Sequence, residues 1–476
     1  MEVTEDQISN IVEVVLKNVQ NQLGDMPAAR AGSSPKGEDG IFATIEEAVT
    51  HSLAAQEQFV EMELSKRVDI IRAIRDAMEE SARTLAEMAV REVAFGRIED
   101  KIKKNLLAAR KAPGIEALPT TAWSGDDGLT LVERGPYGVI GSITPTTNPV
   151  ATITSNAISM LAGGNSVVFN PHPRSKGVTN RAIQIINQAI VAAGGPPNLL
   201  CSVIEPTIET SNELMNHPMI RMLMVTGGPG VVAVAMKTGK KVVAAGPGNP
   251  PVIVDDTANI PRAAKDIVDG ASFDNNVLCI AEKEVYCFED VTDQLKEEMK
   301  KYGAYEISGK QIEDLISLVF VDPAGEHPKI NTKWVGIDAW RILREIDIRV
   351  NEDVRLIIAE VPDEHSFVNA EMLMPVLPIV RVNTIEEALE RAKRAEHGFR
   401  HTACMHSESV SNMSYVARYI DTTIFVKNAP SYAGLGFGGE GHASLSIAGP
   451  TGEGITGPFA FTRERRCVLA GSFRIV

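Results

Sequence analysis

Hydrophobic side chains near the start of the chain recur with the period of an α-helix. They fall at positions i, i+3, i+4, i+7, i+8, i+11 and i+15 of one helix face: Ile8, Ile11, Val12, Val15, Leu16, Val19 and Leu23. Thr4 and Gln7 have the spacing of a capping box, and Gly24 supplies a stop. Residues 24–40 are rich in Gly, Pro, Ala and Ser, which is typical of a flexible linker. The pattern predicts a separate amphipathic helix within residues 1–23.

The pattern changes twice in the rest of the chain. Residues 44–112 carry long amphipathic stretches that are typical of helices, and from about residue 130 short apolar runs alternate with helical stretches. Strands are expected at residues 138–143, 165–170 and 220–227, and helices at residues 152–164 and 179–194. A second alternating set begins near residue 251 and runs to about residue 430. The alternation predicts an α/β fold with doubly wound parallel sheets.

Size, composition and charge narrow the class of protein. With 476 residues, of which 44% are hydrophobic and 23% charged, the chain is long enough for two or three soluble globular domains. Its net charge of −15 argues against a nucleic-acid partner, because phosphate binding needs clustered positive charge. The longest charge-poor stretch, residues 135–173, is interrupted by Thr, Asn, Gly and Pro, so we expect no membrane partner. The acidic N-terminus lacks the positive region of a secretory signal.

The cysteines point to a reducing compartment. There are five, at Cys201, Cys279, Cys287, Cys404 and Cys467, and they are widely spaced with no CxxC pair and no clustered histidines. An odd and sparse set in a long chain predicts a cytoplasmic protein with free thiols rather than a disulfide framework. We therefore expect no metal site.

Two glycine-rich segments are candidates for phosphate binding. Residues 222–236 read as a buried strand, a glycine-rich turn and a helix that opens at Pro229, which suits a phosphate at a helix N-terminus. A formal GxGxxG at Gly436, Gly438 and Gly441 does not lie between a strand and a helix, as the dinucleotide motif requires. We expect this second segment to be a loop near the active site.

Local sequence leaves the role of Cys279 open. It follows an amphipathic segment, residues 263–270, and a polar Asn-Asn pair. A lone cysteine in such a place is either a nucleophile or a small buried hydrophobic residue.

Longer segments show a family resemblance. The stretches GVIGSITPTTNPV, VTGGPGVV, GPGNPPVIVD, GASFDNNVLCIAEKEV and FVKNAPSYAGLGFGGEG are similar to the CoA-acylating branch of the aldehyde dehydrogenase superfamily. Within that branch the chain most resembles the propionaldehyde dehydrogenases of bacterial microcompartments for propanediol utilisation, from Ile41 to its end. The resemblance implies the aldehyde dehydrogenase fold, with Cys279 as the nucleophile.

The implied domains follow the order of that family. They are a Rossmann-like NAD-binding domain over residues 41–247, with an oligomerisation hairpin near residues 120–133, then a catalytic α/β domain over residues 248–440 and a C-terminal oligomerisation segment over residues 441–476. A homodimer or homotetramer is implied.

The resemblance also assigns site residues. Cys279 attacks the aldehyde, and Asn148 stabilises the oxyanion together with the backbone N–H of Cys279. The residues that match the cofactor site are Pro145, Thr146, Asn170, Pro171, His172, Pro173, Thr226, Gly227, Gly228, Ala245, Gly246 and Glu371. Two matches depart from the usual pattern, because Met374 replaces a glycine beside Glu371 and Asn170 replaces a lysine.

One further departure bears on the reaction. Hydrolytic aldehyde dehydrogenases carry a glutamate 34 residues before the cysteine, where it activates water, and this chain has Ala245 there. A CoA thiol, with a pKa of about 8.5, is partly ionised without such a base. The substitution therefore favours transfer of the acyl group to CoA, although it could also mark an inactive enzyme.

The resulting hypothesis is a CoA-acylating enzyme that converts a short-chain aldehyde, with propionaldehyde favoured, NAD and CoA to acyl-CoA and NADH. A non-acylating dehydrogenase and a catalytically silent cargo protein are the alternatives. The residues leave open the aldehyde, the choice of NAD over NADP, and whether His172 or His401 deprotonates CoA.

The N-terminal helix has three possible fates: it packs on its own core, it stays disordered, or it docks onto another protein. Lys17 is its only basic residue, so a protein target is favoured over a membrane surface. The family resemblance implies that residues 4–23 bind a microcompartment shell protein, which would place the enzyme in the lumen.

Overall fold

The computed structural model describes residues 39–324 and 328–476. The helix predicted for residues 4–23, and most of the linker that follows it, lie outside the described residues. All described residues belong to one compact unit that runs from Lys36 to Val476.

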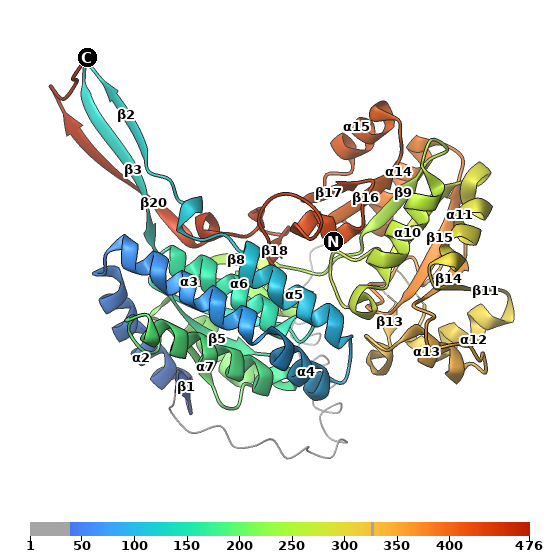
Figure 1. Ribbon diagram of the computed structural model, residues 1–476, viewed down its shortest axis with the longest axis horizontal. Coiled ribbons are helices and arrows are strands. Elements are labelled where there is room, and N and C mark those ends of the chain that lie inside the picture. The colour runs from blue at the N-terminus through green and yellow to red at the C-terminus, as the bar shows by residue number, and fades with distance from the viewer. Residues whose placement is uncertain (1–38, 325–327) are drawn as a thin grey trace. The chain divides into compact units, whose positions relative to one another are not determined.

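The first half of this unit is built on a six-stranded parallel sheet (Figure 1). In spatial order its strands are β1 (Ile41–Phe42), β6 (Leu200–Val203), β5 (Ser166–Pro171), β4 (Val139–Thr144), β7 (Ile220–Thr226) and β8 (Lys241–Ala245). β4 and β5 are buried along their whole length, as central strands covered on both faces must be. Their near-continuous apolar sequence follows from that burial.

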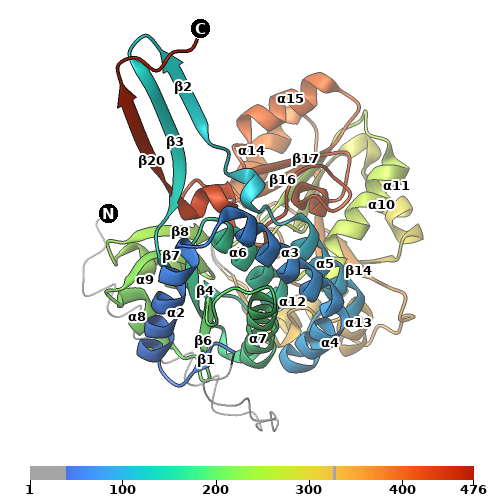
Figure 2. The same cartoon turned by 60° about the vertical axis from the view of Figure 1, so that its left-hand side comes forward.

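Helices cover both faces of this sheet (Figure 2). One face carries α3 (Leu64–Glu80), α4 (Ala82–Val93), α5 (Ile98–Lys111), α6 (Pro149–Ala162) and α7 (Lys176–Ala192), and the other carries α2 (Ile45–Val60), α8 (Ile208–Asn216) and α9 (Pro229–Met236). Successive strand residues point to opposite faces, so Ile140 packs with α6 and α7 while Val139 packs with α2 and α8.

A seven-stranded parallel sheet forms the core of the second half. In spatial order its strands are β11 (Ala304–Ile307), β14 (Leu356–Glu360), β15 (Val376–Val382), β10 (Glu284–Phe288), β9 (Pro251–Val254), β16 (Thr402–His406) and β17 (Ile424–Lys427). α10 (Ile260–Ala271) and α11 (Glu289–Lys301) cover one face, and α12 (Lys310–Val319), α13 (Ala339–Glu345), α14 (Ile385–Ala395) and α15 (Val410–Tyr419) cover the other. Shorter elements complete the chain: β12 (Phe320–Asp322), β13 (Lys329–Ile330), β18 (Ile447–Ala448), β19 (Gly454–Ile455), η1 (Ile115–Ala117), η2 (Pro173–Ser175), η3 (Phe273–Asn276), η4 (Thr332–Trp334), η5 (Ser431–Leu435) and η6 (Pro458–Phe461).

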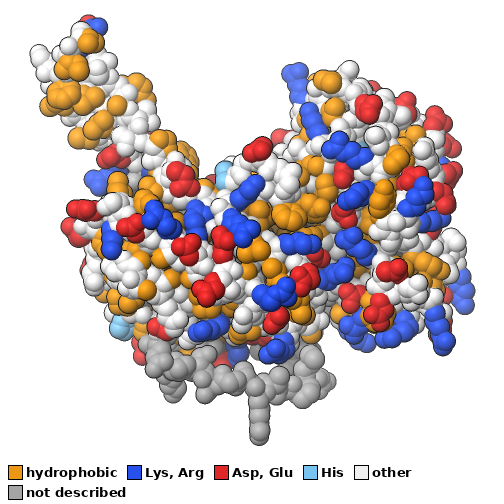
Figure 3. Space-filling view, in the orientation of Figure 1, with side chains coloured by type: hydrophobic (Ala, Val, Ile, Leu, Met, Phe, Trp, Pro, Cys, Tyr) orange, Lys and Arg blue, Asp and Glu red, His pale blue; other side chains and the backbone are white. Residues whose placement is uncertain are grey.

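A three-stranded antiparallel sheet projects from these layers (Figure 1). It joins the hairpin of β2 (Thr121–Gly125) and β3 (Gly128–Pro136) to β20 (Thr462–Ala470), and we call it the arm. Hydrophobic side chains gather on it (Figure 3), and Trp123, Val468 and Leu469 are each more than half exposed. Exposed apolar residues this close together are typical of an interface.

Most elements expected from the hydrophobic pattern are confirmed. Residues 44–112 form α2 to α5, the alternating sets form the two parallel sheets, and α9 opens at Pro229. The GxGxxG run lies between η5 and β18 and is followed by no helix, which confirms that it is a loop. Within residues 39–324 and 328–476, no helix combines the length and the apolar character needed to cross a bilayer.

Candidate active site

Cys279 lies just after an unusual backbone turn. Three consecutive residues of η3, Asp274, Asn275 and Asn276, have φ values of 49°, 55° and 67°. Residues other than glycine rarely adopt this left-handed conformation, and it persists only where the surroundings enforce it. The side chain of Asn276 donates to the carbonyl oxygens of Ala271 (2.8 Å) and Glu282 (3.0 Å), which closes the turn on itself. The strained turn therefore sets the position of the cysteine.

Two buried charged residues after Cys279 hold the same turn. Lys283 is 2% exposed and donates to the carbonyl oxygens of Asn276 and Leu278, both at 3.3 Å, and to the Asn276 side chain. Glu282 is fully buried and accepts hydrogen bonds from the backbone N–H (2.7 Å) and hydroxyl (2.8 Å) of Ser431. The loop that carries the cysteine is thus fixed on both sides.

The thiol of Cys279 is protonated in its present surroundings. Burial and the nearby Glu371 carboxylate raise its pKa to about 12, while the ammonium group of Lys283 opposes this rise. The other cysteines differ in place: Cys201, Cys287 and Cys404 are buried in the hydrophobic cores, and Cys467 is exposed on the arm. All five are free, as the sequence predicted.

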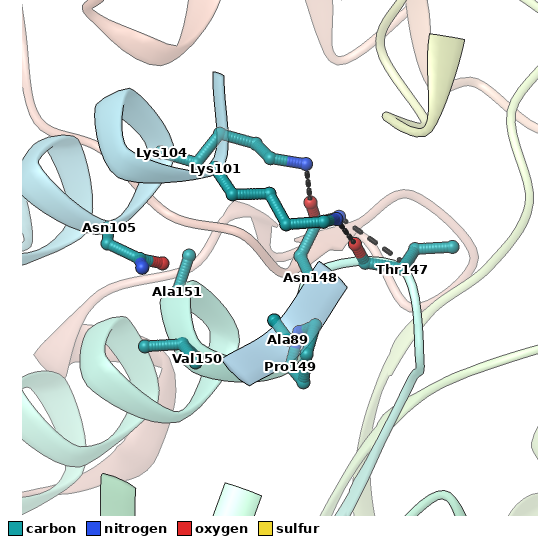
Figure 4. A pocket seen from close by; sticks show the side chains of 9 residues that line it. All are labelled: Ala89, Lys101, Lys104, Asn105, Thr147, Asn148, Pro149, Val150 and Ala151. Carbon is teal, nitrogen blue, oxygen red and sulfur yellow. Dashed lines mark hydrogen bonds between the residues drawn. The ribbon is translucent and has the colours of Figure 1, made fainter. Parts of the chain in front are cut away.

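Asn148 lies at the end of β4, where the chain enters α6. It is the N-cap residue of that helix, but its side chain makes no capping hydrogen bond. Instead its carbonyl oxygen accepts a hydrogen bond of 2.6 Å from the ammonium group of Lys104 (Figure 4). The amide NH₂ points away from Lys104 and lies 3.4 Å from the Thr147 hydroxyl.

Most sequence-predicted cofactor residues lie along one edge of the first sheet. The carboxyl ends of neighbouring strands meet there, and ligands of open α/β sheets bind outside such ends. Pro145 and Thr146 directly follow β4, and residues 170–173 cover the end of β5 and the two positions after it. Thr226 ends β7 and is followed by Gly227 and Gly228, and Ala245 ends β8 and is followed by Gly246. The fold brings these four segments together because β5, β4, β7 and β8 are direct neighbours.

The glycine turn before α9 fits a phosphate group. A Cβ added at Gly228 would meet no heavy atom within 4 Å, and one at Gly227 would touch only Val231 at 3.9 Å. No side chain caps the N-terminus of α9. An open backbone at a helix N-terminus favours bound phosphate, so these residues fit the pyrophosphate of NAD.

Asn170 contributes differently from the other residues of this edge. Its amide is 2% exposed, donates to the Ser211 hydroxyl (2.7 Å) and accepts from the Thr210 hydroxyl (2.7 Å). The side chain therefore ties β5 to the first turn of α8.

Glu371 reaches the site from the second sheet. It precedes β15, and its carboxylate accepts a hydrogen bond of 3.4 Å from the backbone N–H of Gly248. Burial raises its pKa, and Lys283 opposes that rise. Gly248 in turn passes so close to the nucleophile loop that an added Cβ would lie 2.6 Å from the carbonyl oxygen of Cys279. Glu371, Gly248 and Cys279 are thus neighbours.

The chain reaches Gly248 directly from Ala245. Ala245 is 3% exposed at the end of β8, and a Cβ on the next residue, Gly246, would lie 3.2 Å from the ring of Pro450. The stretch therefore runs past the nucleophile without a carboxylate. Among the residues it contains, none can act as a base for water.

His401, one of two histidines considered for CoA, is a poor base. It is 1% exposed, and burial together with the charge of Lys283 lowers its pKa to about 4. A Cβ on Gly248 would lie 3.0 Å from its ring, so the ring packs directly against this glycine.

Comparison with known sequences identifies close relatives. The sequence matches the aldehyde dehydrogenase family over residues 37–314 and 355–454. It is 47% identical over 475 residues to the acetylating acetaldehyde dehydrogenase EutE of Salmonella typhimurium, covering 99% of this chain and 100% of that protein. It is 43% identical over 465 residues to the CoA-propanoylating propanal dehydrogenase of the same organism, covering 98% and 99%.

Solved structures share the fold along nearly the whole chain. The propionaldehyde dehydrogenase of the Clostridium phytofermentans fucose utilisation microcompartment has a TM-score of 0.90 and 48% identity, over 92% of this chain and 100% of that chain. The Rhodopseudomonas palustris enzyme, solved with bound CoA and an acylated cysteine, has a TM-score of 0.89 and 49% identity, over 91% and 99%. An engineered glycolyl-CoA reductase with bound NADP⁺ has a TM-score of 0.89 and 48% identity, over 94% and 100%.

One residue of interest was missed in the sequence. The Clostridium enzyme was also solved as two alanine variants, of a cysteine and of a histidine 118 positions further along that chain. In this chain His397 follows Cys279 by the same number of positions. Its ring nitrogen Nε2 lies 3.2 Å from the carbonyl oxygen of Asn369, two residues before Glu371. No local pattern around His397 distinguishes it from His401, so sequence reasoning could not select it.

Proposed function

The chain belongs to the aldehyde dehydrogenase family, and from this membership and the site around Cys279 we propose that it is a CoA-acylating aldehyde dehydrogenase. It would oxidise a short-chain aldehyde, propionaldehyde in the first instance, with NAD, and transfer the acyl group to CoA. The observation that carries the choice of acceptor is Ala245: it ends β8 three residues before Gly248, which approaches the carbonyl oxygen of Cys279, and it stands where a hydrolytic enzyme has a glutamate.

The reaction begins at the thiol of Cys279. Its sulfur attacks the aldehyde carbon while the thiol proton passes to the aldehyde oxygen, which gives a thiohemiacetal. The Asn148 amide and the backbone N–H of Cys279 stabilise the negative charge that develops on this oxygen. Bound NAD supplies the acceptor for the hydride that leaves this carbon. As the hydride leaves, the thiohemiacetal hydroxyl releases its proton to solvent and a thioester remains on Cys279. The CoA thiolate attacks this thioester, which forms acyl-CoA and releases the Cys279 thiolate, and the thiolate then takes up a proton.

The second half of the reaction needs a proton acceptor for CoA, and we propose His397 for this role. It is partly exposed at the C-terminal end of α14, and its hydrogen bond to Asn369 holds it beside the loop that carries Glu371. An imidazole nitrogen can act as a general base toward a thiol.

A pre-steady-state experiment tests the acceptor. Without CoA the enzyme should release about one NADH per active site in a burst and then leak slowly, because water attacks the thioester poorly without a base. Ala245→Glu should raise this leak, and Cys279→Ala, the matched control, should show neither burst nor leak. Fast and sustained release of free acid by the wild type without CoA would refute the proposal.

The same proposal assigns the parts of the chain. Residues 41–247 would bind the cofactor, residues 248–440 would carry the catalytic cysteine, and residues 441–476 together with the hairpin near residues 120–133 would build the subunit interface of a homodimer or homotetramer. The exposed hydrophobic side chains of the arm support an interface there.

We also propose that residues 4–23 bind a microcompartment shell protein and direct the enzyme to the lumen. Support comes from the aliphatic stripe of this segment and from the microcompartment origin of the Clostridium relative. A helix of this length is only marginally stable alone, so its apolar face needs a partner.

A further inference from the structure

We propose that Lys104 is a positioning residue: it fixes the amide of Asn148 in the orientation that the oxyanion requires, and it binds this amide to the loop that carries Cys279. The inference rests on the proposed function, because it concerns the thiohemiacetal step of that reaction.

Lys104 contacts both Asn148 and the turn that precedes Cys279. It lies on α5 and is 3% exposed, and its ammonium nitrogen donates to the Asn148 side-chain oxygen at 2.6 Å. The same nitrogen donates to the carbonyl oxygen of Val277 at 3.2 Å and forms an ion pair with Asp274. Asn148 comes from the first sheet, whereas Asp274 and Val277 precede the nucleophile, so one side chain joins the two (Figure 4 shows the Asn148 half).

The hydrogen bond from Lys104 fixes which end of the Asn148 amide, the oxygen or the NH₂, faces Lys104. An ammonium group has three donors and no acceptor, so it can bind only the oxygen of Asn148 and never its NH₂. A rotation of the amide by 180° would place donor against donor in a buried site, where an unsatisfied polar group is unfavourable. The NH₂ of Asn148 therefore stays on the far side from Lys104, with a long contact of 3.4 Å to the Thr147 hydroxyl.

Neighbouring groups stabilise the positive charge of Lys104. Asp274 also accepts from Lys101 at 3.0 Å and from the backbone N–H of Arg97 at 2.6 Å, and Lys101 and Lys104 lie three residues apart on one face of α5. Burial lowers the pKa of Lys104 to about 8, and Asp274 opposes this. A buried cation of this kind is retained only where its partners compensate its desolvation.

Kinetics of a charge-removing variant test the role. Removal of one oxyanion donor costs about 10²- to 10³-fold in kcat, so Lys104→Met should lower kcat for NADH formation by about 10²-fold. The KM for the aldehyde should change less than about threefold, because the loss falls on the transition state. The matched control is Lys103→Met, at the preceding position of α5. The Lys103 ammonium group is half exposed and pairs with Asp100 at 3.0 Å, so this variant should retain wild-type kcat.

A double-mutant cycle separates positioning from a general structural effect. If Lys104 acts through the amide, then Lys104→Met in an Asn148→Ala background should lower kcat by less than about threefold further. Alkylation of Cys279 by iodoacetamide needs no oxyanion donor, so Lys104→Met should slow it by no more than a few fold. Additive losses in the cycle, or an unchanged kcat in Lys104→Met, would overturn the inference.

The test remains decisive if other parts fail. NADH formation precedes acyl transfer, so a wild type that releases free acid without CoA would refute the proposed acceptor while the cycle still reports on Lys104. If Lys104→Met does not fold by circular dichroism, Lys104→Gln keeps an N–H donor of similar reach and should retain at least a tenth of wild-type kcat. If neither variant folds, Lys104 is a structural residue and the inference is wrong.

Discussion

Alkylation of Cys279 by iodoacetamide measures the ionisation of the nucleophile directly, because only the thiolate reacts. The perturbations are pH, between 6 and 10, and replacement of the nearby cation by Lys283→Met. Burial and Glu371 raise the pKa of Cys279 to about 12, and Lys283 is the first of the groups that lower it. The free enzyme should therefore alkylate slowly at neutral pH, and more slowly without Lys283.

The magnitude follows from the pKa. At pH 7 a thiol of pKa about 12 is ionised in about one molecule in 10⁵, whereas a free cysteine of pKa about 8.5 is ionised in roughly three in 10². The higher pKa also makes the thiolate more nucleophilic. With a Brønsted slope of about 0.4–0.5, the rate constant of the thiolate rises roughly 40-fold. Cys279 should thus react about 10²-fold more slowly than an exposed thiol, and its rate should rise tenfold per pH unit up to pH 10.

The assay is peptide mass spectrometry of the alkylated protein. A short unstructured peptide with one cysteine, added to each sample, serves as the reference thiol, since both thiols meet the same reagent. Lys283→Met should slow Cys279 by about tenfold, or roughly one pKa unit, with the exposed Lys333→Met as its control. A rate for Cys279 that reaches a plateau below pH 9, or that is indifferent to Lys283, would refute this account of the site.

Three further predictions address stability, acyl transfer and targeting. Gly270→Ala should lower the free energy of unfolding by about 1–3 kcal/mol in thermal or denaturant melts, because its Cβ would lie 2.1 Å from the buried Glu282 carboxylate. The control is Gly230→Ala, which should not lower it, because a Cβ at Gly230 would meet no heavy atom within 4 Å. His397→Gln should leave the NADH burst intact and lower CoA-dependent turnover at least tenfold at pH 7; the loss should shrink as pH rises past the pKa of the CoA thiol, and an unchanged turnover would exclude His397 as the base. Deletion of residues 1–23 should leave kcat and KM unchanged but abolish co-purification with shells, and continued co-purification would contradict the targeting role.

The alternation of short apolar runs with helical stretches was sufficient to predict the two parallel sheets. Strands such as β4 and β5 are buried on both faces, so their apolar runs are long and their boundaries are marked by glycine, asparagine and proline. The glycine turn at Gly227 was visible for a similar local reason. By contrast, the segment around Cys279 leaves its role ambiguous, and only the family resemblance assigns it as the nucleophile.

Features that depend on contacts between distant segments could not be predicted. Lys104 is one of several basic residues on an amphipathic helix, and only the fold brings it to Asn148, 44 positions later, and to Asp274. The left-handed turn at residues 274–276 has no local signal either, since aspartate and asparagine occupy ordinary turns as well. Likewise no local pattern indicates that the Asn170 amide bonds to Thr210 and Ser211 of α8.

The arm makes assembly of subunits depend on completion of the chain, because its third strand, β20, is synthesised near the end. β3 pairs with β20 along nine residue positions, and Arg134 on β3 donates to the Thr462 hydroxyl, 328 positions later. A ribosome must therefore produce every strand of the second sheet before the hairpin of β2 and β3 can acquire its third strand. Until then the hairpin is a two-stranded ribbon, which is marginally stable in water. If the arm is the subunit interface, nascent chains cannot associate through a finished interface, and truncated translation products are kept out of the oligomer.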